Sequence, residues 1–179
     1  MKIIGFAGKA GVGKTTSATH LGYFISQGRD NFVPIAAFAD LLKVQCGKLF
    51  GLAENQLHGY RKEVIDPRYR KTPRQIMQEY GQAVRDIHYN AWVDATMREI
   101  DLLYPHYPVV LIHDVRYPNE VEAIRARGGR IYLLRRDTGR EDAHISENAI
   151  EGWSFTWDGV IENNGTLAEL YEQVEEIVQ

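Results

Sequence analysis

The chain has 179 residues, a formal net charge of −3 and 44% hydrophobic residues, values typical of one globular domain with a sizeable core. The acidic balance argues against broad binding to nucleic acid or to a membrane surface, because both select basic proteins. No apolar run approaches the ~20 residues of a membrane span, and no segment has the pattern of a signal peptide. The single cysteine, Cys46, cannot form an internal disulfide, so we expect a reducing, cytoplasmic setting.

The first predicted element is a buried strand at residues 3–7, followed directly by a phosphate-binding motif. Residues 8–15 are GKAGVGKT, which matches the pattern G-x-x-x-x-G-K-[ST]. A helical pattern then runs from Lys14 to about Gln27, so strand, loop and helix stand in the order that the motif requires. Glycines let backbone N–H groups face an anion, and the helix N-terminus adds the positive end of its dipole. The sequence therefore predicts that Lys14 neutralises the phosphates of a nucleoside triphosphate and that Thr15 ligates Mg²⁺.

Four further apolar runs predict strands at residues 33–38, 109–113, 130–134 and 159–161, with helical patterns between them. The runs are continuous rather than alternating, which is typical of a parallel sheet covered by helices on both faces. We therefore expect an α/β fold with a five-stranded parallel sheet. Ligands of such folds bind at the carboxyl ends of the strands.

The segment between the second and third strands, about residues 39–107, is too long for one crossover helix and predicts an inserted helical region. The core of this single domain would then comprise residues 1–38, 108–136 and 157–179. In the insertion, Thr72 and Pro73 predict the start of a helix that continues to about Ile87. Its predicted apolar side consists of Ile76, Met77, Tyr80, Val84 and Ile87. A separate stripe contains Arg74, Gln78, Gly81 and Arg85. The last helix is predicted to begin at Thr166, with Glu169 as its capping-box partner.

Charged side chains follow the predicted strands. Asp40 is a candidate helix N-cap after the second strand, and Lys43 would lie one turn later on the ligand side. After the third strand, Asp114 could hold Mg²⁺ directly or through water, and the planar guanidinium of Arg116 suits a phosphate. The segment at about residues 137–156 lacks apolar periodicity and predicts a lid.

The balance of charge at the strand ends bears on the type of acceptor. Transfer to an alcohol calls for a positioned carboxylate base, whereas a phosphate oxygen is already anionic and needs none. The difficulty with a phosphate acceptor is to bring two polyanions together, which requires many cations. Lysine and arginine occur at most strand ends of this otherwise acidic chain. That local excess favours a phosphate acceptor.

The motifs taken together resemble the nucleoside monophosphate kinases, most closely the deoxynucleoside monophosphate kinases of tailed bacteriophages. The resemblance spans most of the chain and rests on GKAGVGKTT, FADLLK, TPRQIMQEYG with WVD at 92–94, DVRYPNE, HISE at 144–147 and ENNGTLAEL. It implies a P-loop NTPase fold with an inserted region that binds the nucleoside monophosphate, and a lid. It also implies ATP as phosphoryl donor, Mg²⁺ as cofactor and a deoxynucleoside monophosphate as the small-molecule partner. A phage origin would place the protein in the cytoplasm of the host cell.

The resemblance further implies roles for the matching residues. The donor and Mg²⁺ would be bound by Gly11, Val12, Gly13, Lys14, Thr15, Thr16, Asn163 and Gly165, the last two at the adenine, with Asp114 organising Mg²⁺. The acceptor nucleotide would be bound by Asp40, Lys43, Arg74, Gln78, Arg85, Trp92 and Arg116. Gln78 would contact the base, and Trp92 and Tyr80 would form stacking walls. The catalytic residues would be Lys14, Asp114, Arg116 and two lid arginines, Arg136 and Arg140.

Two alternatives remain open from the sequence. A kinase for another small molecule, similar to dephospho-coenzyme A kinase, would keep the loop and could use Asp40 as the base. A nucleotide-dependent switch protein is less favoured, because the guanine-binding N/T-K-x-D pattern is absent. The accepted bases, the preference between ribose and deoxyribose, and the oligomeric state, a homodimer included, are also open.

Overall fold

The computed structural model describes residues 1–27, 32–137 and 156–178. The chain forms two compact units, the first comprising Met1–Ala37 with Met97–Gln179 and the second Phe38–Thr96. The second unit thus ends at Thr96, earlier than the end near residue 107 expected for the insertion, because the later turns of α5 (Ala91–Leu103) belong to the first unit. No helix in the described ranges is both long and apolar enough to cross a bilayer.

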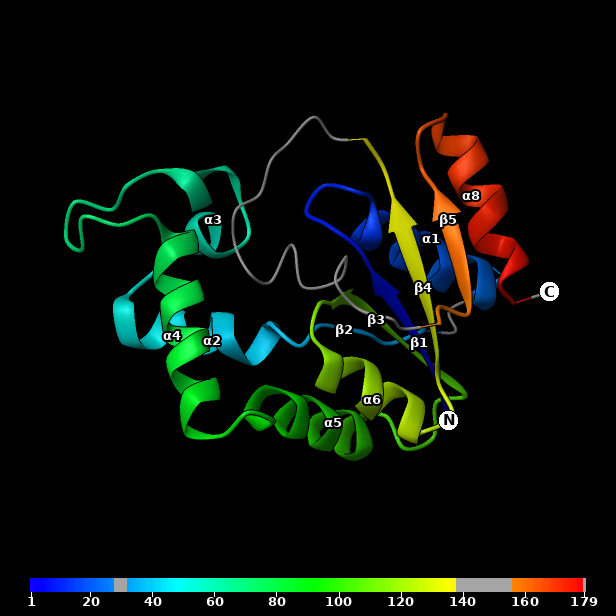
Figure 1. The fold of residues 1–179 in the computed structure, drawn as a ribbon, viewed down its shortest axis with the longest axis horizontal. Helices are drawn as coiled ribbons and strands as arrows, with labels where there is room; N and C mark the ends of the chain where they lie inside the picture. Colours follow the sequence, from blue (N-terminus) through cyan, green and yellow to red (C-terminus); the bar gives the residue numbers. More distant parts are fainter. Residues whose placement is uncertain (28–31, 138–155, 179) are drawn as a thin grey trace. The chain divides into compact units, whose positions relative to one another are not determined.

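The first unit contains a five-stranded sheet in the order β2-β3-β1-β4-β5, in which every pair of neighbours is parallel (Figure 1). This confirms the predicted α/β fold. The strands are β1 (Lys2–Ala7), β2 (Ile35–Ala36), β3 (Val109–Val115), β4 (Arg130–Arg135) and β5 (Gly159–Glu162).

Two strand boundaries differ from the prediction. β2 is only two residues long rather than six, although the apolar run around it is longer. β3 continues beyond the predicted end at His113 as far as Val115. Asp114 therefore lies within a strand and not after it, because the pairing of β3 with β1 continues to the pair Ala7 and Val115.

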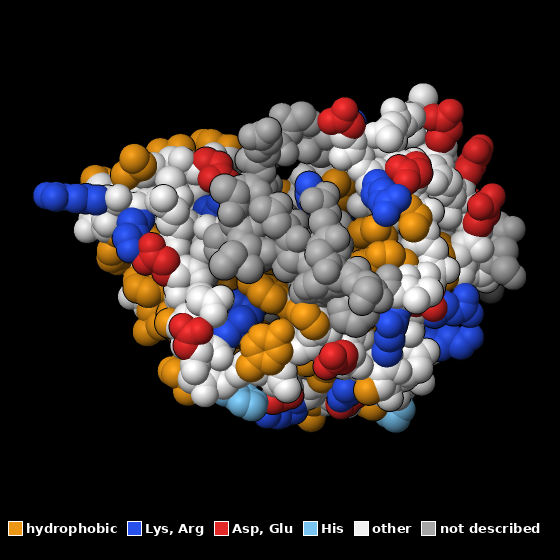
Figure 2. All heavy atoms as spheres, viewed as in Figure 1, with side chains coloured by type: hydrophobic (Ala, Val, Ile, Leu, Met, Phe, Trp, Pro, Cys, Tyr) orange, Lys and Arg blue, Asp and Glu red, His pale blue; other side chains and the backbone are white. Residues whose placement is uncertain are grey.

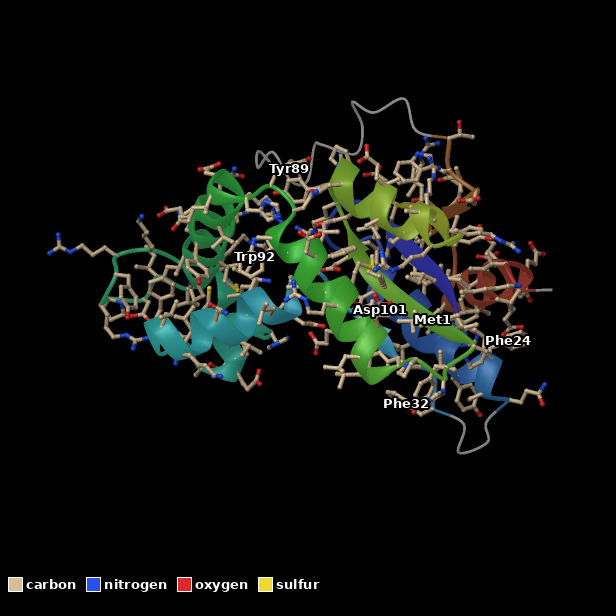
Figure 3. The ribbon with its side chains drawn as sticks, turned by 90° about the horizontal axis from the view of Figure 1, so that it is seen from below. Met1, Phe24, Phe32, Tyr89, Trp92 and Asp101 are labelled. Carbon is tan, nitrogen blue, oxygen red and sulfur yellow. The ribbon has the colours of Figure 1, made fainter. Side chains whose placement is uncertain are left out.

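Helices cover both faces of this sheet. Figures 1 and 3 show α1 (Lys14–Ser26) and α8 (Leu167–Glu176) on one face, and α6 (Pro118–Ala126) on the other. The side chains of β1 alternate accordingly. Ile4 and Phe6 are buried in a cluster with residues of α1 and α8. A Cβ atom at Gly5 would lie only 2.9 Å from Ile124 Cδ1, so α6 packs directly against the backbone of β1.

The second unit is helical, with α2 (Asp40–Phe50), α3 (Glu54–Leu57), the 3-10 helix η1 (Tyr60–Glu63) and α4 (Pro73–Ile87). Its small core consists of Cys46, Leu52, Leu57, Ile76 and Met77. Burial raises the pKa of the Cys46 thiol to about 11, so this cysteine packs as a small apolar group and is not a ready nucleophile.

The predicted helix caps at Thr72 and Thr166 are confirmed. Thr72 Oγ1 accepts a hydrogen bond from Gln75 N, and Gln75 Oε1 accepts one from Thr72 N, which closes a capping box at the start of α4. Thr166 and Glu169 form the same arrangement at α8. The prediction that Ile87 belongs to the apolar side of α4 is wrong. Its side chain is 87% exposed, because the helix ends there, beyond the part that packs on the small core.

Candidate functional site

The loop between β1 and α1 has the backbone geometry of a phosphate cradle. Gly8, Gly11 and Gly13 have φ angles of +139°, +79° and +104°, a region that glycine adopts at little cost. At Gly8 a Cβ atom would also lie 2.5 Å from the carbonyl oxygen of Leu134, so close packing on β4 independently requires glycine. Successive backbone N–H groups in such a conformation can converge on one anion.

The side chain of Lys14 lies across this loop. Its Nζ donates hydrogen bonds to the carbonyl oxygens of Gly8, at 2.7 Å, and Lys9, at 2.6 Å, and the residue is only 8% exposed. The ammonium charge is therefore held beside the loop before any ligand arrives. A cation fixed in this way loses little conformational entropy when it binds a phosphate.

A side chain from the far edge of the sheet also holds the loop. Asn163 follows β5, and its Nδ2 donates a hydrogen bond of 2.9 Å to the carbonyl oxygen of Val12. Its backbone N–H donates to the carbonyl oxygen of Arg135, at 2.8 Å. The side chain expected at the adenine of ATP is thus engaged with the phosphate loop itself.

Gly165 has a structural explanation of its own. A Cβ atom there would overlap the carboxylate of Glu169, which caps α8 by accepting from Thr166 N. This backbone hydrogen bond, together with the one from the Thr166 hydroxyl, lowers the pKa of Glu169. Figure 2 shows acidic side chains gathered over the edge formed by β5 and α8. A hollow at this edge is lined by Glu162, Gly165, Thr166, Glu169, Leu170, Glu172, Gln173 and Glu176, a set unsuited to phosphate groups.

The end of β3 brings a histidine to the phosphate loop that the sequence alone did not single out. His113 Nδ1 lies 3.3 Å from Thr15 Oγ1, although the two residues are far apart in sequence. The ladder between β1 and β3 shifts here, with three steps from Ile112 to Val115 opposite two steps from Gly5 to Ala7. Such a bulge breaks the strict alternation of side chains, so His113 and Asp114 need not point to opposite faces. The position of His113 at the carboxyl end of a predicted strand could have indicated it.

The turn after β3 is fixed by a buried glutamate. Glu120 is 2% exposed, and its Oε2 accepts hydrogen bonds from the backbone N–H groups of Arg116, at 2.6 Å, and Tyr117, at 3.0 Å. It thereby caps α6 and sets the path of the chain that presents Arg116. The glutamate of DVRYPNE thus acts on the backbone of Arg116.

In the second unit, two cations assigned to the acceptor each face a carboxylate. Lys43 Nζ lies 3.6 Å from Asp40 Oδ1, one turn earlier on α2, and the Lys43 side chain is 16% exposed. Arg74 Nε donates a hydrogen bond to Glu63 Oε1. The prediction that Asp40 is an N-cap is wrong, because the N-cap position is Ala39 and Asp40 is the first helical residue.

The stripe on α4 faces α2. A Cβ atom at Gly81 would lie 3.3 Å from Leu42 Cδ2, so the absence of a side chain at Gly81 allows the two helices to approach closely. Gln78 is half-buried one turn before Gly81, and Arg85 is half-buried one turn after it. Both polar residues thus lie on the same stripe of α4 as Gly81, the position at which α4 approaches Leu42 of α2.

Trp92, expected to stack on a base, is buried within the second unit. It is 5% exposed, and its Nε1 donates a hydrogen bond of 3.0 Å to the carbonyl oxygen of Gly81 (Figure 3). Its ring meets that of Tyr80 edge to face, 6.1 Å between centroids. Tyr80 in turn donates to Gln45 Oε1. These contacts indicate that Trp92 supports α4 from within and does not present a free face to a nucleotide.

The expected lid lies almost wholly outside the described residues. Arg140 and the HISE sequence are both outside them, whereas Arg136 is described and is exposed just after β4. Within the described ranges, no group of three or more His, Cys, Asp or Glu side chains could hold a metal ion. A hydroxyl at Thr15 and a carboxylate at Asp114 do fit Mg²⁺, which prefers oxygen ligands and keeps several waters.

The family model and two relatives found by sequence carry the name of one enzyme class. A family model described as deoxynucleotide monophosphate kinase matches residues 43–174, a range that does not include the phosphate loop. A protein of Acanthamoeba polyphaga mimivirus, whose name assigns it to the same class, is 34% identical over 97% of this chain and 94% of its own length. The deoxynucleotide monophosphate kinase of Escherichia phage RB69 is 32% identical over 49% of this chain and 36% of its own length.

Solved structures share the fold at low sequence identity. Dephospho-CoA kinase from Campylobacter jejuni has a TM-score of 0.55 and 11% identity, covering 100% of this chain and 96% of that one. The protein TT1252 from Thermus thermophilus has a TM-score of 0.52 and 16% identity, covering 99% and 96%. At these identities the likeness shows the fold alone.

Proposed function

The chain belongs to the deoxynucleotide monophosphate kinase family of phosphotransferases, and we propose that it transfers the γ-phosphate of ATP to a deoxynucleoside monophosphate. The observation that carries this proposal is the phosphate loop with Lys14 held across it. The family match begins at Lys43, beyond the loop, so the two lines of support come from different parts of the chain.

We assign the donor phosphates to the first unit. The N–H groups of the loop from Gly11 to Thr16 and the N-terminus of α1 supply dipoles, and Lys14 supplies a full charge. These groups are in place before the reaction, so little reorganisation is needed as charge shifts toward the leaving oxygen of ADP.

We assign Mg²⁺ to Thr15 and Asp114, with water and phosphate oxygens completing its ligands. When bound, Mg²⁺ would neutralise charge on the phosphates. Near the first of these residues, His113 Nδ1 lies within reach of the Thr15 hydroxyl and can orient its proton.

We assign the acceptor phosphate to Lys43 and Arg74 of the second unit. Arg116 and Arg136 of the first unit are assigned to neutralising negative charge on the phosphates. Asp40 and Glu63 face Lys43 and Arg74, so each cation is already oriented by a carboxylate that a phosphate can replace. Gln78 and Arg85 lie on the stripe that faces α2 and are candidates for contact with the base or sugar. No general base is required, because the attacking phosphate oxygen is anionic.

The proposal is tested with purified protein, Mg·ATP and each deoxynucleoside monophosphate in separate reactions, with ADP and the deoxynucleoside diphosphate separated by chromatography. We expect equal amounts of ADP and deoxynucleoside diphosphate with at least one acceptor. Lys14→Ala protein, shown to be folded by circular dichroism, is the matched control for contaminating kinases. The absence of diphosphate with every acceptor, or ADP release that no acceptor increases, would contradict the proposal.

A further inference from the structure

We propose that Asn163 is a positioning residue that aims the N–H group of Gly13 at the phosphates of the donor. This inference rests on the proposed function only in naming ATP as the donor. It gives Asn163 a different role from the contact with adenine that the resemblance implies, and it concerns the geometry of the loop itself.

The first support is the contact between the Asn163 side chain and the loop. Nδ2 donates to the carbonyl oxygen of Val12 at 2.9 Å, and both residues are buried, with exposed fractions of 6% and 2%. A hydrogen bond shielded from water is stronger than an exposed one, and its loss leaves a buried carbonyl without this partner. An amide used in this way has little surface left for a base.

Because the peptide bond is planar, the contact at the Val12 oxygen also sets the direction of the Gly13 N–H group, which can donate to an anion. In a trans peptide the C=O of one residue and the N–H of the next point in opposite directions. Holding the Val12 oxygen against Asn163 therefore directs the Gly13 N–H away from Asn163. Helix α1 begins at the next residue, Lys14. The Gly13 N–H therefore lies at the helix N-terminus, where an anion such as phosphate is favoured.

The environment of Gly13 shows that this arrangement is close-packed. A Cβ atom at Gly13 would lie 2.7 Å from Asn163 Nδ2, so the amide occupies the space that any other residue would fill. With its φ angle of +104°, Gly13 is thus required both by the backbone conformation and by the approach of Asn163.

Asn163 is itself firmly placed. Its backbone N–H bonds to the carbonyl oxygen of Arg135 at the end of β4, and β5 pairs with β4 up to Arg135 and Glu162. The side chain thus extends from β5, two strands away from β1 in the sheet, to the loop that follows β1. The pairing of β5 with β4 thus fixes Asn163, and Asn163 in turn fixes the peptide between Val12 and Gly13.

The test compares Asn163→Ala and Asn163→Asp with the wild-type protein. The aspartate keeps the size of the side chain but cannot donate to the Val12 oxygen. Gln173→Ala is the matched control, because Gln173 exchanges two hydrogen bonds with the backbone of Glu162 and holds the same strand end to α8 without touching the loop. Binding of ATP and of inorganic tripolyphosphate is measured by isothermal titration calorimetry.

We expect both Asn163 variants to bind ATP and tripolyphosphate more weakly, each by about tenfold or more, with the aspartate the weaker of the two. Gln173→Ala should bind both ligands as the wild type does. A loss for ATP without a loss for tripolyphosphate would assign Asn163 to the adenine and overturn the proposal. Unchanged binding of both ligands by a folded variant would also overturn it, as would an equal loss in Gln173→Ala.

A second measurement needs no variant. In ¹⁵N-labelled wild-type protein, the Gly13 amide resonance should shift on addition of tripolyphosphate, and a resonance that stays in place at saturation contradicts the proposal. Neither measurement depends on phosphoryl transfer. Failure of the kinase assay with normal tripolyphosphate binding would count against the proposed function and leave the role of Asn163 standing.

Discussion

The ammonium nitrogen of Lys14 lies 2.7 Å from the carbonyl oxygen of Gly8, so the lysine is bonded to the first glycine of the same motif. The second acceptor, the carbonyl oxygen of Lys9, is the next along the loop. These bonds hold the ammonium group of a buried residue, since only 8% of Lys14 is exposed. The motif thus orders its own cation before a nucleotide binds.

Lys14→Ala should therefore lower kcat by about 10²-fold or more, because it removes a charge held where negative charge develops. The fold should persist, since the strand and helix on either side pack through other residues. Lys2→Ala, at an exposed lysine of β1, is the control and should retain wild-type rates. Steady-state kinetics with saturating substrates and a thermal melt check both statements, and a wild-type kcat in Lys14→Ala would remove this residue from the mechanism.

Lys43→Ala should raise KM for the deoxynucleoside monophosphate by about tenfold or more and leave KM for ATP nearly unchanged. The reason is that Lys43 is assigned to the acceptor phosphate alone. Lys48→Ala removes an exposed lysine from the same helix and should change neither constant. Equal increases in both KM values would show that Lys43 acts on the whole fold and not on the acceptor.

Asp114→Asn should increase the concentration of Mg²⁺ that gives half-maximal activity and lower kcat at saturating Mg²⁺. The carboxylate is assigned to Mg²⁺ and its waters, and an amide attracts the cation less strongly. Asp101→Asn is a matched control, because Asp101 pairs with Arg127 at the surface of the same unit. Titration of Mg²⁺ at fixed ATP measures the effect, and an unchanged Mg²⁺ requirement would argue for a purely structural Asp114.

Trp92→Phe should destabilise the protein by about 1–2 kcal/mol, because it removes the hydrogen bond to Gly81 and part of a buried ring. Tyr60→Phe, at a residue that is 83% exposed, is the control and should have little effect. Urea unfolding gives the free energies. A change in base preference without a loss of stability would instead restore the prediction that Trp92 stacks on the acceptor base.

Asp66 should make the stability of the second unit dependent on pH. Hydrogen bonds from the Arg68 side chain, and then from Gln56, hold the pKa of this carboxyl well below its usual range. A lowered folded-state pKa means that the stabilisation is fully present above the unfolded pKa of about 3.9 and is lost as pH falls toward the folded value. Asp66→Asn should therefore melt at a lower temperature than wild type at pH 7.

The difference in melting temperature between wild type and Asp66→Asn should shrink as the pH is lowered below about 4, where the wild-type carboxyl loses its advantage. Thermal melts of both proteins across this range provide the measurement. A difference in melting temperature that is constant with pH would show that the ionised form of Asp66 is not what stabilises the second unit. Asp86→Asn, on the exposed side of α4, serves as the control for a general effect of removing one carboxylate.

Several parts of the structure were predictable because they depend on neighbours in the chain. The loop from Gly8 to Thr15 is contiguous, and its glycines specify their own backbone conformation. The caps at Thr72 and Thr166 are likewise closed by residues three positions away. The apolar runs predicted all five strands, but the bounds of β2 and β3 differ from the prediction, because the length of a strand depends on its pairing with the neighbouring strand.

Contacts between residues far apart in the chain could not be predicted from such local patterns. The burial of Trp92 depends on a carbonyl of α4, and the exposure of Ile87 depends on where the small core ends. The bulge at His113 and Asp114 depends on the register of β3 against β1. Nothing in a periodic pattern of apolar residues specifies a register shift of this kind.

The sequence by itself determined the α/β fold and a loop with the phosphate-binding pattern, because a contiguous motif and local periodicity encode both. Only the tertiary structure decided which side chains hold the loop in place. Asn163 and Val12 are 151 positions apart, and His113 and Thr15 are 98 apart. Their meeting follows from the order of the strands in the sheet, which brings the ends of β3 and β5 to the loop after β1.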